Sequence, residues 1–323
     1  MGQLRIKLLG QYAIQHDGRP LDELSTKAAE MLCYLFLHRD RPHTRETLAE
    51  VLWADIPAER AQKYFRQTLW QLQSALNGKP DGERGEGAGL ILLGPGWLRI
   101  NAEADWWLDV DILERAYSLC LSSDVAALSD AQAQTLELAA ELYDGDLLAT
   151  WDHDWCIYER ERLQLIYLAI MDYLMSFCEA RRAYARGVAF GQRILRYDPA
   201  RESTYCQLMR LHYLAGDRTT ALREYGRCVA ALAREFGMPP AQQTVALYEQ
   251  IRADRREEVA ALSGLSTATV ARGDAHPAEL HMRIERLQAS LAAFQSHVQQ
   301  ELAALRQLLR QQQTPQQTSR ETP

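Results

Sequence analysis

The spacing at which hydrophobic residues repeat changes along this chain, and that change constrains the fold more than any other feature. Near the N-terminus, Leu4, Ile6 and Leu8 alternate with polar residues, which predicts short β-strands. Further along, the period becomes helical, and from Asp105 to about Ile251 it predicts helices with no strand. The chain is therefore expected to be a mainly α protein with small β elements in its N-terminal part.

Residues 1–103 predict a compact unit of strands, three helices and a hairpin. The signals are, in order, a turn at Asp17-Gly18, a helix start at Ser25 or Thr26, a second at Thr44, a third at Pro57, a glycine-rich loop from Gly78 to Gly89, and a hairpin over Leu90–Ile100 that turns at Gly94-Pro95-Gly96. Three helices followed by a hairpin are the arrangement of a winged helix-turn-helix domain.

Residues 104–254 predict an all-α domain built from pairs of helices. A weak repeat with a spacing of about 34 residues aligns Ala221 with Gly187, two small residues where helices approach closely. Pro199 separates successive helices. Helix length and this spacing favour stacked antiparallel pairs of the tetratricopeptide type.

The C-terminal part predicts a polar linker (255–278), a coiled-coil helix (279–312) and a disordered tail (313–323). The apolar positions of that helix are Leu280, Ile284, Leu287, Leu291, Phe294, Val298, Leu305 and Leu308. Glu301 interrupts the series. Because a single helix needs a partner to bury such a stripe, a homo-oligomer is expected, and folding back onto the helical domain is the alternative.

The third helix of the first domain is the most informative segment. Its apolar side is expected to hold Ala58, Ala61, Phe65, Leu69, Leu72 and Leu76. Its other side is expected to hold Arg60, Lys63, Tyr64, Gln67, Gln71 and Ser74, with Arg66 and Trp70 at the flanks. This other side carries no acid after Glu59. Arginine, lysine and amide side chains reach the phosphates and base edges of a DNA major groove.

An ordinary solvated helix face is the competing interpretation of this helix. DNA recognition is favoured by two features of this helix. It has a long run without acids although the protein is acidic, and it lies between a short helix and a hairpin with a glycine turn. The residues predicted to contact double-stranded DNA are Arg60, Lys63, Tyr64, Arg66, Gln67, Gln71 and Ser74, together with Thr44 at the start of the second helix and Arg99 in the hairpin.

Composition narrows the class of protein. The 323-residue chain has 36 basic and 43 acidic side chains, a formal net charge of −7, so nucleic-acid binding needs one local surface. The N-terminus is too short and too polar for a signal peptide, and no apolar run reaches the length of a membrane span. A cytoplasmic protein without a membrane partner is expected.

Catalytic and metal-binding chemistry finds little support in the residues. Asp144, Asp146, Asp152, His153 and Asp154 crowd together but lack the spacing of a calcium loop, so capping and ion pairing are expected of them. The six cysteines form no C-x-x-C pair and predict buried reduced thiols. Because no P-loop or hydrolase motif occurs, we expect no enzyme, no cofactor and no metal.

Two segments of the first domain resemble the winged helix of OmpR/PhoB-type regulators, and most closely the Streptomyces antibiotic regulatory protein group. They are TRETLAEVLW at residues 44–53 and FRQTLWQL at 65–72. The second domain is similar to the bacterial transcriptional activator domain through LYDGDLL at 142–148, Trp155 with ERERL at 159–163, DPARE at 198–202, LMR at 208–210, GD at 216–217, ALREY at 221–225 and LAREFG at 232–237. This ordered series covers roughly residues 4–253.

The resemblance implies a DNA-binding winged helix followed by a tetratricopeptide-like module used in transcription activation. Such a regulator would read promoter DNA with its third helix and contact RNA polymerase or another regulator with its helical domain. Family members usually carry arginine where this chain has Gln71 and Gln73, which removes phosphate contacts. Residues 1–103 also hold as many acids as bases. The alternative is therefore a helical protein-interaction scaffold whose winged helix has lost affinity for DNA.

Overall fold

The computed structural model describes residues 3–21, 24–77, 89–255 and 259. All the described residues belong to one compact unit. The predicted glycine-rich loop between Gly78 and Gly89 lies outside the described residues except at its last position. The same holds for the coiled-coil helix at 279–312, the tail at 313–323 and all but two residues of the linker.

The N-terminal strands form as the period-two pattern predicts. β1 (Leu4–Lys7) pairs antiparallel with β2 (Ala13–His16), which pairs with the two-residue β3 (Arg19–Pro20). Asp17 and Gly18 both have positive φ, at 52° and 73°, the backbone that a two-residue hairpin turn needs. The predicted turn is thus confirmed.

Three helices follow, and side-chain caps begin the first two. α1 (Thr26–Leu37) has Ser25 as its N-cap, and α2 (Arg45–Leu52) has Thr44, whose hydroxyl accepts from the Thr47 amide at 3.1 Å. α3 (Ala58–Asn77) begins directly after Pro57, whose carbonyl accepts from the amides of Arg60 and Ala61. α2 and α1 both pack against α3. All three predicted helix starts are confirmed.

A hairpin completes the winged helix. β5 (Ile91–Gly94) pairs with β6 (Trp97–Ile100), and the short β4 (His43–Thr44) pairs with the other edge of β6. Pro95 and Gly96 form the turn, where Gly96 adopts a φ of 81°. The structure is a mainly α fold with small β elements, as the sequence predicts.

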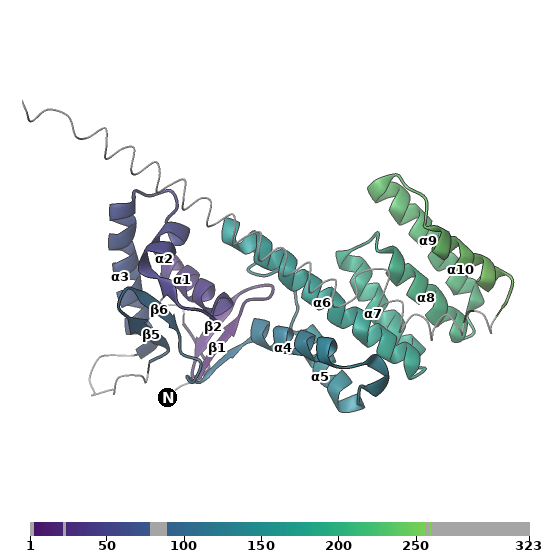
Figure 1. Ribbon diagram of the computed structural model, residues 1–323, viewed down its shortest axis with the longest axis horizontal. Coiled ribbons are helices and arrows are strands. Elements are labelled where there is room, and N and C mark those ends of the chain that lie inside the picture. Colours follow the sequence, from purple (N-terminus) through teal and green to yellow (C-terminus); the bar gives the residue numbers. More distant parts are fainter. Residues whose placement is uncertain (1–2, 22–23, 78–88, 256–258, 260–323) are drawn as a thin grey trace, which may run out of the picture. The chain divides into compact units, whose positions relative to one another are not determined.

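Stacked helices make up the rest of the compact unit (Figure 1). Their bounds are α4 (Asp109–Ser122), the 3₁₀ turn η1 (Val125–Ala127), α5 (Asp130–Glu141), α6 (Asp154–Ala180), α7 (Tyr184–Tyr197), α8 (Glu202–Leu214), α9 (Arg218–Phe236) and α10 (Gln242–Arg252). Short loops join α6 to α7 and α8 to α9, so each pair packs as an antiparallel hairpin. α7 and α9 begin about 34 residues apart, the tetratricopeptide period.

The prediction that no strand occurs after Asp105 is wrong at one point. β7 (Trp106–Leu108) pairs parallel with β1, so the first sheet has the order β3-β2-β1-β7. A three-residue strand is too short to produce a recognisable alternation, and its parallel partner lies about 100 residues earlier in the chain. Through β7, the segment that leads into α4 completes the sheet of the winged helix.

One helix forms the core of the helical part. Within the described residues, α6 is the one helix long and apolar enough to span a membrane, and 67% of its most apolar window is buried inside the structure. Tyr167, Ile170, Met171 and Leu174 on this helix are all buried. The apolar composition of α6 is explained by its burial among the helices that pack around it, as in the core of many globular proteins.

Candidate nucleic-acid interface

α3 presents its apolar side to the rest of the winged helix. Ala61, Phe65, Leu69, Leu72 and Leu76 are each at most 8% exposed, as the helical period predicts. Ala58, which the sequence placed in this row, is exposed in the first turn. Trp53 at the end of α2 packs edge-on against Phe65, with ring centroids 6.5 Å apart. This packing holds the opposite side of α3 toward solvent.

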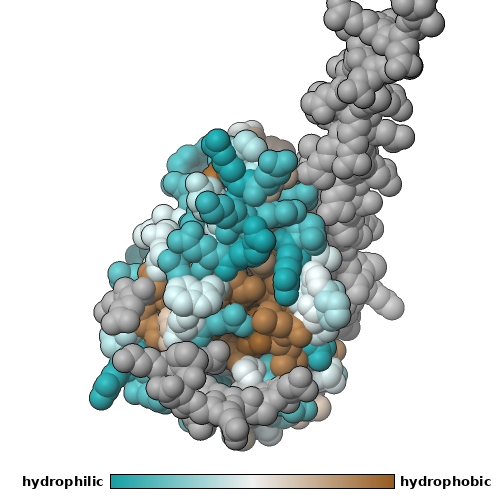
Figure 2. All heavy atoms as spheres, turned by 90° about the vertical axis from the view of Figure 1, so that its left-hand side faces the viewer, coloured by the Kyte–Doolittle hydropathy of each residue, from teal (hydrophilic) through white to brown (hydrophobic). Residues whose placement is uncertain are grey.

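We call that opposite side the outward face of α3. It consists of exposed residues only, namely Arg60, Lys63, Tyr64, Arg66, Gln67, Trp70 and Ser74. Figure 2 views the molecule from the side on which α3 lies in Figure 1, and hydrophilic residues gather over the upper part of that view. Three of the seven carry a positive charge, and Glu59 in the first turn is the one acid on α3, so the outward face beyond that turn is complementary to an anionic surface.

Two glutamines lie at the margins of the outward face. Gln71 and Gln73 are half-buried, and Gln71 accepts a 3.3 Å hydrogen bond at Oε1 from the hydroxyl of Ser25, the N-cap of α1. Gln71 is therefore tied to a neighbouring helix and is less accessible than Gln67. The sequence pattern assigns Gln71 to the same side as Gln67, because it contains no information about where α1 packs.

Thr44 and Arg99 come from the other two elements of the candidate interface. Thr44 is exposed and pairs with Trp97 of β6, while its hydroxyl is engaged as the cap of α2. Arg99 is exposed on the hairpin, with its guanidinium carbon 5.9 Å from the centroid of the Trp97 ring. The pairing of β4 with β6 joins the start of α2 to the hairpin.

Trp70 is a residue that the sequence pattern did not select as a site residue. It is 68% exposed, the most exposed large apolar side chain that the structure describes. At about 100° per residue, it lies between Arg66 and Lys63 around the helix and hence within the outward face.

A buried carboxylate connects the sheet of the winged helix to the helical part. Asp109, the first residue of α4, is fully buried and accepts hydrogen bonds from the backbone amides of Leu8, Leu9 and Val110 at 2.8–3.0 Å. Burial raises the pKa of Asp109, and the three amides oppose that rise. Beyond β1, Leu9 forms a further antiparallel bridge with Leu147.

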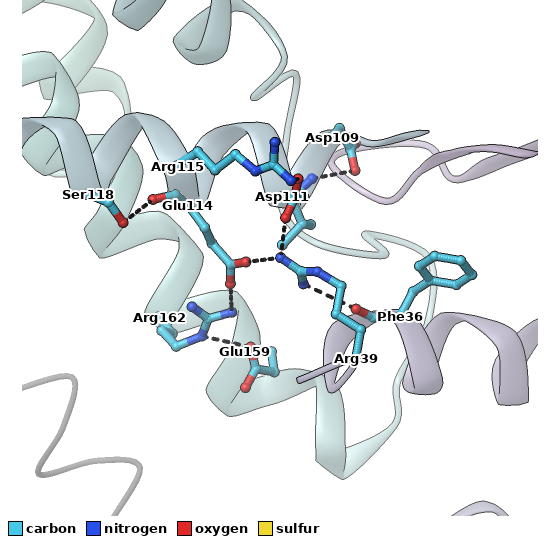
Figure 3. A network of polar contacts seen from close by, with 10 residues as sticks. Phe36, Arg39, Asp109, Asp111, Glu114, Arg115, Ser118, Glu159 and Arg162 are labelled. Carbon is cyan, nitrogen blue, oxygen red and sulfur yellow. Dashed lines mark hydrogen bonds and ion pairs between the residues drawn. The ribbon is translucent and has the colours of Figure 1, made fainter. Parts of the chain in front are cut away.

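Ion pairs extend the same junction across three helices (Figure 3). Glu114 of α4 contacts Arg39, which follows α1, at 2.5 Å and Arg162 of α6 at 2.7 Å. Arg39 also contacts Asp111, and Arg162 contacts Glu159, both at 2.8 Å. Although burial lowers the pKa of Arg39 and Arg162, these carboxylates outweigh it and raise both values. The side chains are 10–25% exposed, so water screens the network only in part.

The acidic segment between α5 and α6 takes part in contacts with the winged helix. Asp144 lies 3.6 Å from Lys7, and His153 lies 3.3 Å from the buried Glu30 of α1. Among the described residues, no group of three His, Cys, Asp or Glu side chains has the arrangement of a metal site. Five of the six cysteines are buried and Cys206 is half-buried, and none of the six is in a disulfide bond.

The helical part is similar to a known domain family. The family model of the bacterial transcriptional activator domain matches residues 108–252. The transcriptional regulatory protein MoaR1 of Mycobacterium tuberculosis (strain ATCC 25618 / H37Rv) is 23% identical over 255 residues, which are 77% of this chain and 79% of MoaR1. MoaR1 of Mycobacterium bovis (strain BCG / Pasteur 1173P2) matches to the same extent.

A solved structure shares the fold. It is that of Mycobacterium tuberculosis EmbR in complex with a low affinity phosphopeptide, and it aligns with a TM-score of 0.65 at 19% sequence identity. The alignment covers 84% of this chain and 72% of the EmbR chain. It extends well beyond the helical part and includes the arrangement of winged helix followed by stacked helices.

Proposed function

We propose that this transcriptional regulator, a member of the group that carries the bacterial transcriptional activator domain, binds duplex DNA through the outward face of α3. The observation that carries the proposal is the composition of that face, in which Arg60, Lys63 and Arg66 are exposed and no carboxylate follows Glu59 of the first turn. Cations on a helix that fits a major groove contact phosphates, and Gln67 has the donor and acceptor needed to read adenine. Arg99 on the hairpin adds a further cation.

The helical part is proposed to contact RNA polymerase or another regulator, which makes the protein an activator acting in the cytoplasm. Stacked helix pairs build extended surfaces suited to protein partners. The C-terminal segment at 279–312 is proposed to pair with a second copy, because two tethered winged helices raise each other's effective concentration at adjacent half-sites. Light scattering of the full chain and of a chain ending at residue 278 tests this, since a monomeric full chain at micromolar concentration contradicts it.

The alternative, a scaffold without DNA affinity, is weakened by the position of the two glutamines. Arginines at positions 71 and 73 would stand at half-buried margins, whereas the cations of this chain stand on the exposed face. The neutral amides therefore leave the main electrostatic surface in place.

A fluorescence titration of the full chain against random and genomic duplexes at two salt concentrations tests DNA binding. Replacing Arg60 and Lys63 together by Ala is expected to weaken binding to every sequence and to lower the salt slope by about 2, because roughly one counterion is released per phosphate contact. Replacing Gln67 by Ala is instead expected to change sequence preference, by about 1–3 kcal/mol.

The matched control is the double replacement of Arg223 and Arg234 by Ala. Both arginines are exposed on α9 in the helical part, so the net charge changes equally and the outward face of α3 is untouched. Equal loss of affinity in the two double variants would mean that general charge, and not α3, attracts DNA. Unchanged binding in the Arg60 and Lys63 variant would exclude α3 as the DNA-binding element.

A further inference from the structure

Trp70 contributes little to packing inside the winged helix. Its indole is 68% exposed, while its neighbour Leu69 is 7% exposed and Leu72 is fully buried. The adjacent leucines therefore provide the contacts that hold α3 in place. Leaving a large aromatic ring in water forgoes the stabilisation that its burial would bring, and such rings are characteristic of binding surfaces.

The surroundings of Trp70 favour one class of partner. Arg66 lies one turn before it on the same side of α3, and Lys63 lies two turns before it. Gln67 and Ser74, each within one turn, are exposed and neutral, and no carboxylate follows Glu59 on this helix. An aromatic ring among cations and without acids is complementary to a polyanion that also presents apolar groups.

Duplex DNA meets both conditions in its major groove, where the 5-methyl group of thymine is the apolar group among the base edges. The indole has a single N–H donor and no acceptor, so it cannot distinguish bases by a paired hydrogen-bond pattern. We propose that Trp70 determines specificity by packing against a thymine methyl group when the outward face of α3 enters the major groove. This inference rests on the proposed DNA binding and adds the chemical group that is recognised.

The test begins with selection of preferred sequences from duplexes with a random core, using the full chain. Each thymine of the selected sequence is then replaced in turn by uracil, which removes the 5-methyl group and leaves the hydrogen-bonding edge unchanged. For the wild-type chain, uracil at one position is expected to weaken binding about fourfold, the effect of one methyl group leaving an apolar contact. For Trp70→Ala, uracil at that position is expected to have no effect.

Two further variants keep this test decisive. Trp70→Phe retains an aromatic ring and is expected to retain sensitivity to uracil at the same position. Phe236→Ala removes an aromatic side chain that is 61% exposed at the end of α9, and it is expected to bind DNA like the wild type. Circular dichroism and thermal melting confirm that Trp70→Ala is folded, which its exposure predicts.

The possible failures are distinguishable. If uracil weakens the wild type and Trp70→Ala equally at every position, Trp70 does not read a thymine methyl and the inference is wrong. If Trp70→Ala binds all duplexes like the wild type but loses binding to purified RNA polymerase, the ring faces a protein and the inference is again wrong. If the wild-type chain enriches no duplex and binds none, the proposed function itself fails.

Discussion

His38 lies at the end of α1 in a group of aromatic rings. Its ring centroid is 4.6 Å from that of Tyr34 and 6.1 Å from that of His43, and His43 Nε2 lies 2.9 Å from the His38 carbonyl oxygen. Burial, together with the charges of Arg41, His43 and Arg162, lowers the pKa of His38 from 6.5 to about 3. The imidazole is therefore neutral in the folded chain across the physiological range.

This neutral imidazole makes the free energy of unfolding depend on pH. Between pH 6.5 and about pH 3 the unfolded chain binds a proton at His38 that the folded chain does not bind. The contribution of His38 to the free energy of unfolding is therefore complete above pH 6.5 and decreases as the pH falls, by about 2 kcal/mol at pH 5. His38→Gln is expected to remove this part of the slope, as urea denaturation between about pH 5 and about pH 7.5 would measure. An unchanged slope in the variant would mean that His38 is not the titrating group.

Residues of the candidate interface differ in how far the sequence could predict them. The helical period correctly placed Arg60, Lys63 and Gln67 on the exposed side, because their exposure depends only on which side of α3 is apolar. It could not predict the half-burial of Gln71, which depends on contact with Ser25, a residue 46 positions earlier. Trp70 was expected at a flank of this side, although the same period places it between Arg66 and Lys63 and it is 68% exposed.

At the scale of elements, glycines decide how closely the helix pairs of the helical part approach. A Cβ at Gly191 in α7 would lie 2.7 Å from Cε of Met175 in α6 and 2.8 Å from Cδ2 of Leu208 in α8. A Cβ at Gly226 in α9 would meet nothing within 4 Å. The two glycines are both helical, so they differ only in their surroundings.

Replacing each glycine by Ala is therefore expected to change stability in opposite directions. Gly191→Ala gains helix propensity of up to about 1 kcal/mol but overpacks three helices at a cost of about 1–3 kcal/mol, so the free energy of unfolding falls. Gly226→Ala gains the same propensity without a clash and raises it by about 0.5–1 kcal/mol. Denaturant unfolding of the two variants measures both effects, and stabilisation by Gly191→Ala would show that α7 can move away from its neighbours without cost.

Most elements could be predicted because their signals are local. Ser25 and Thr44 cap helices as their types suggest, and Pro95-Gly96 makes the turn of the hairpin. β7 escaped prediction because its existence depends on β1, and the chain order gives no sign that the two meet. The connection between Asp109 and the amides of Leu8 and Leu9 was hidden for the same reason.

At the scale of the whole molecule, the described contacts join the winged helix and the helical part into one unit. β7 adds to the sheet, Asp109 binds the end of β1, and Glu114 bridges Arg39 to Arg162. Gly10 and Gly145 also touch, since a Cβ at Gly145 would lie 3.2 Å from the Cα of Gly10. A partner bound to the helical part would therefore act on a winged helix whose orientation is already set by these contacts.

Glu114 joins α1 to α6 through its two ion pairs. Glu114→Ala leaves Arg39 with Asp111 and Arg162 with Glu159 but removes the group that joins α1 to α6 through α4. Because the pairs are largely shielded from water, a loss of about 1–3 kcal/mol in the free energy of unfolding is expected. Hydrogen exchange measured by mass spectrometry is expected to become faster at the end of α1 as well as in α6, since both depend on the bridge.

Arg115→Ala is the matched control. Arg115 is 73% exposed and pairs with Asp111 on its own helix, so its loss should lower the free energy of unfolding by less than about 0.5 kcal/mol. Faster exchange confined to α4 and α6 would show that Glu114 supports the helical part alone and that other contacts hold the winged helix in place.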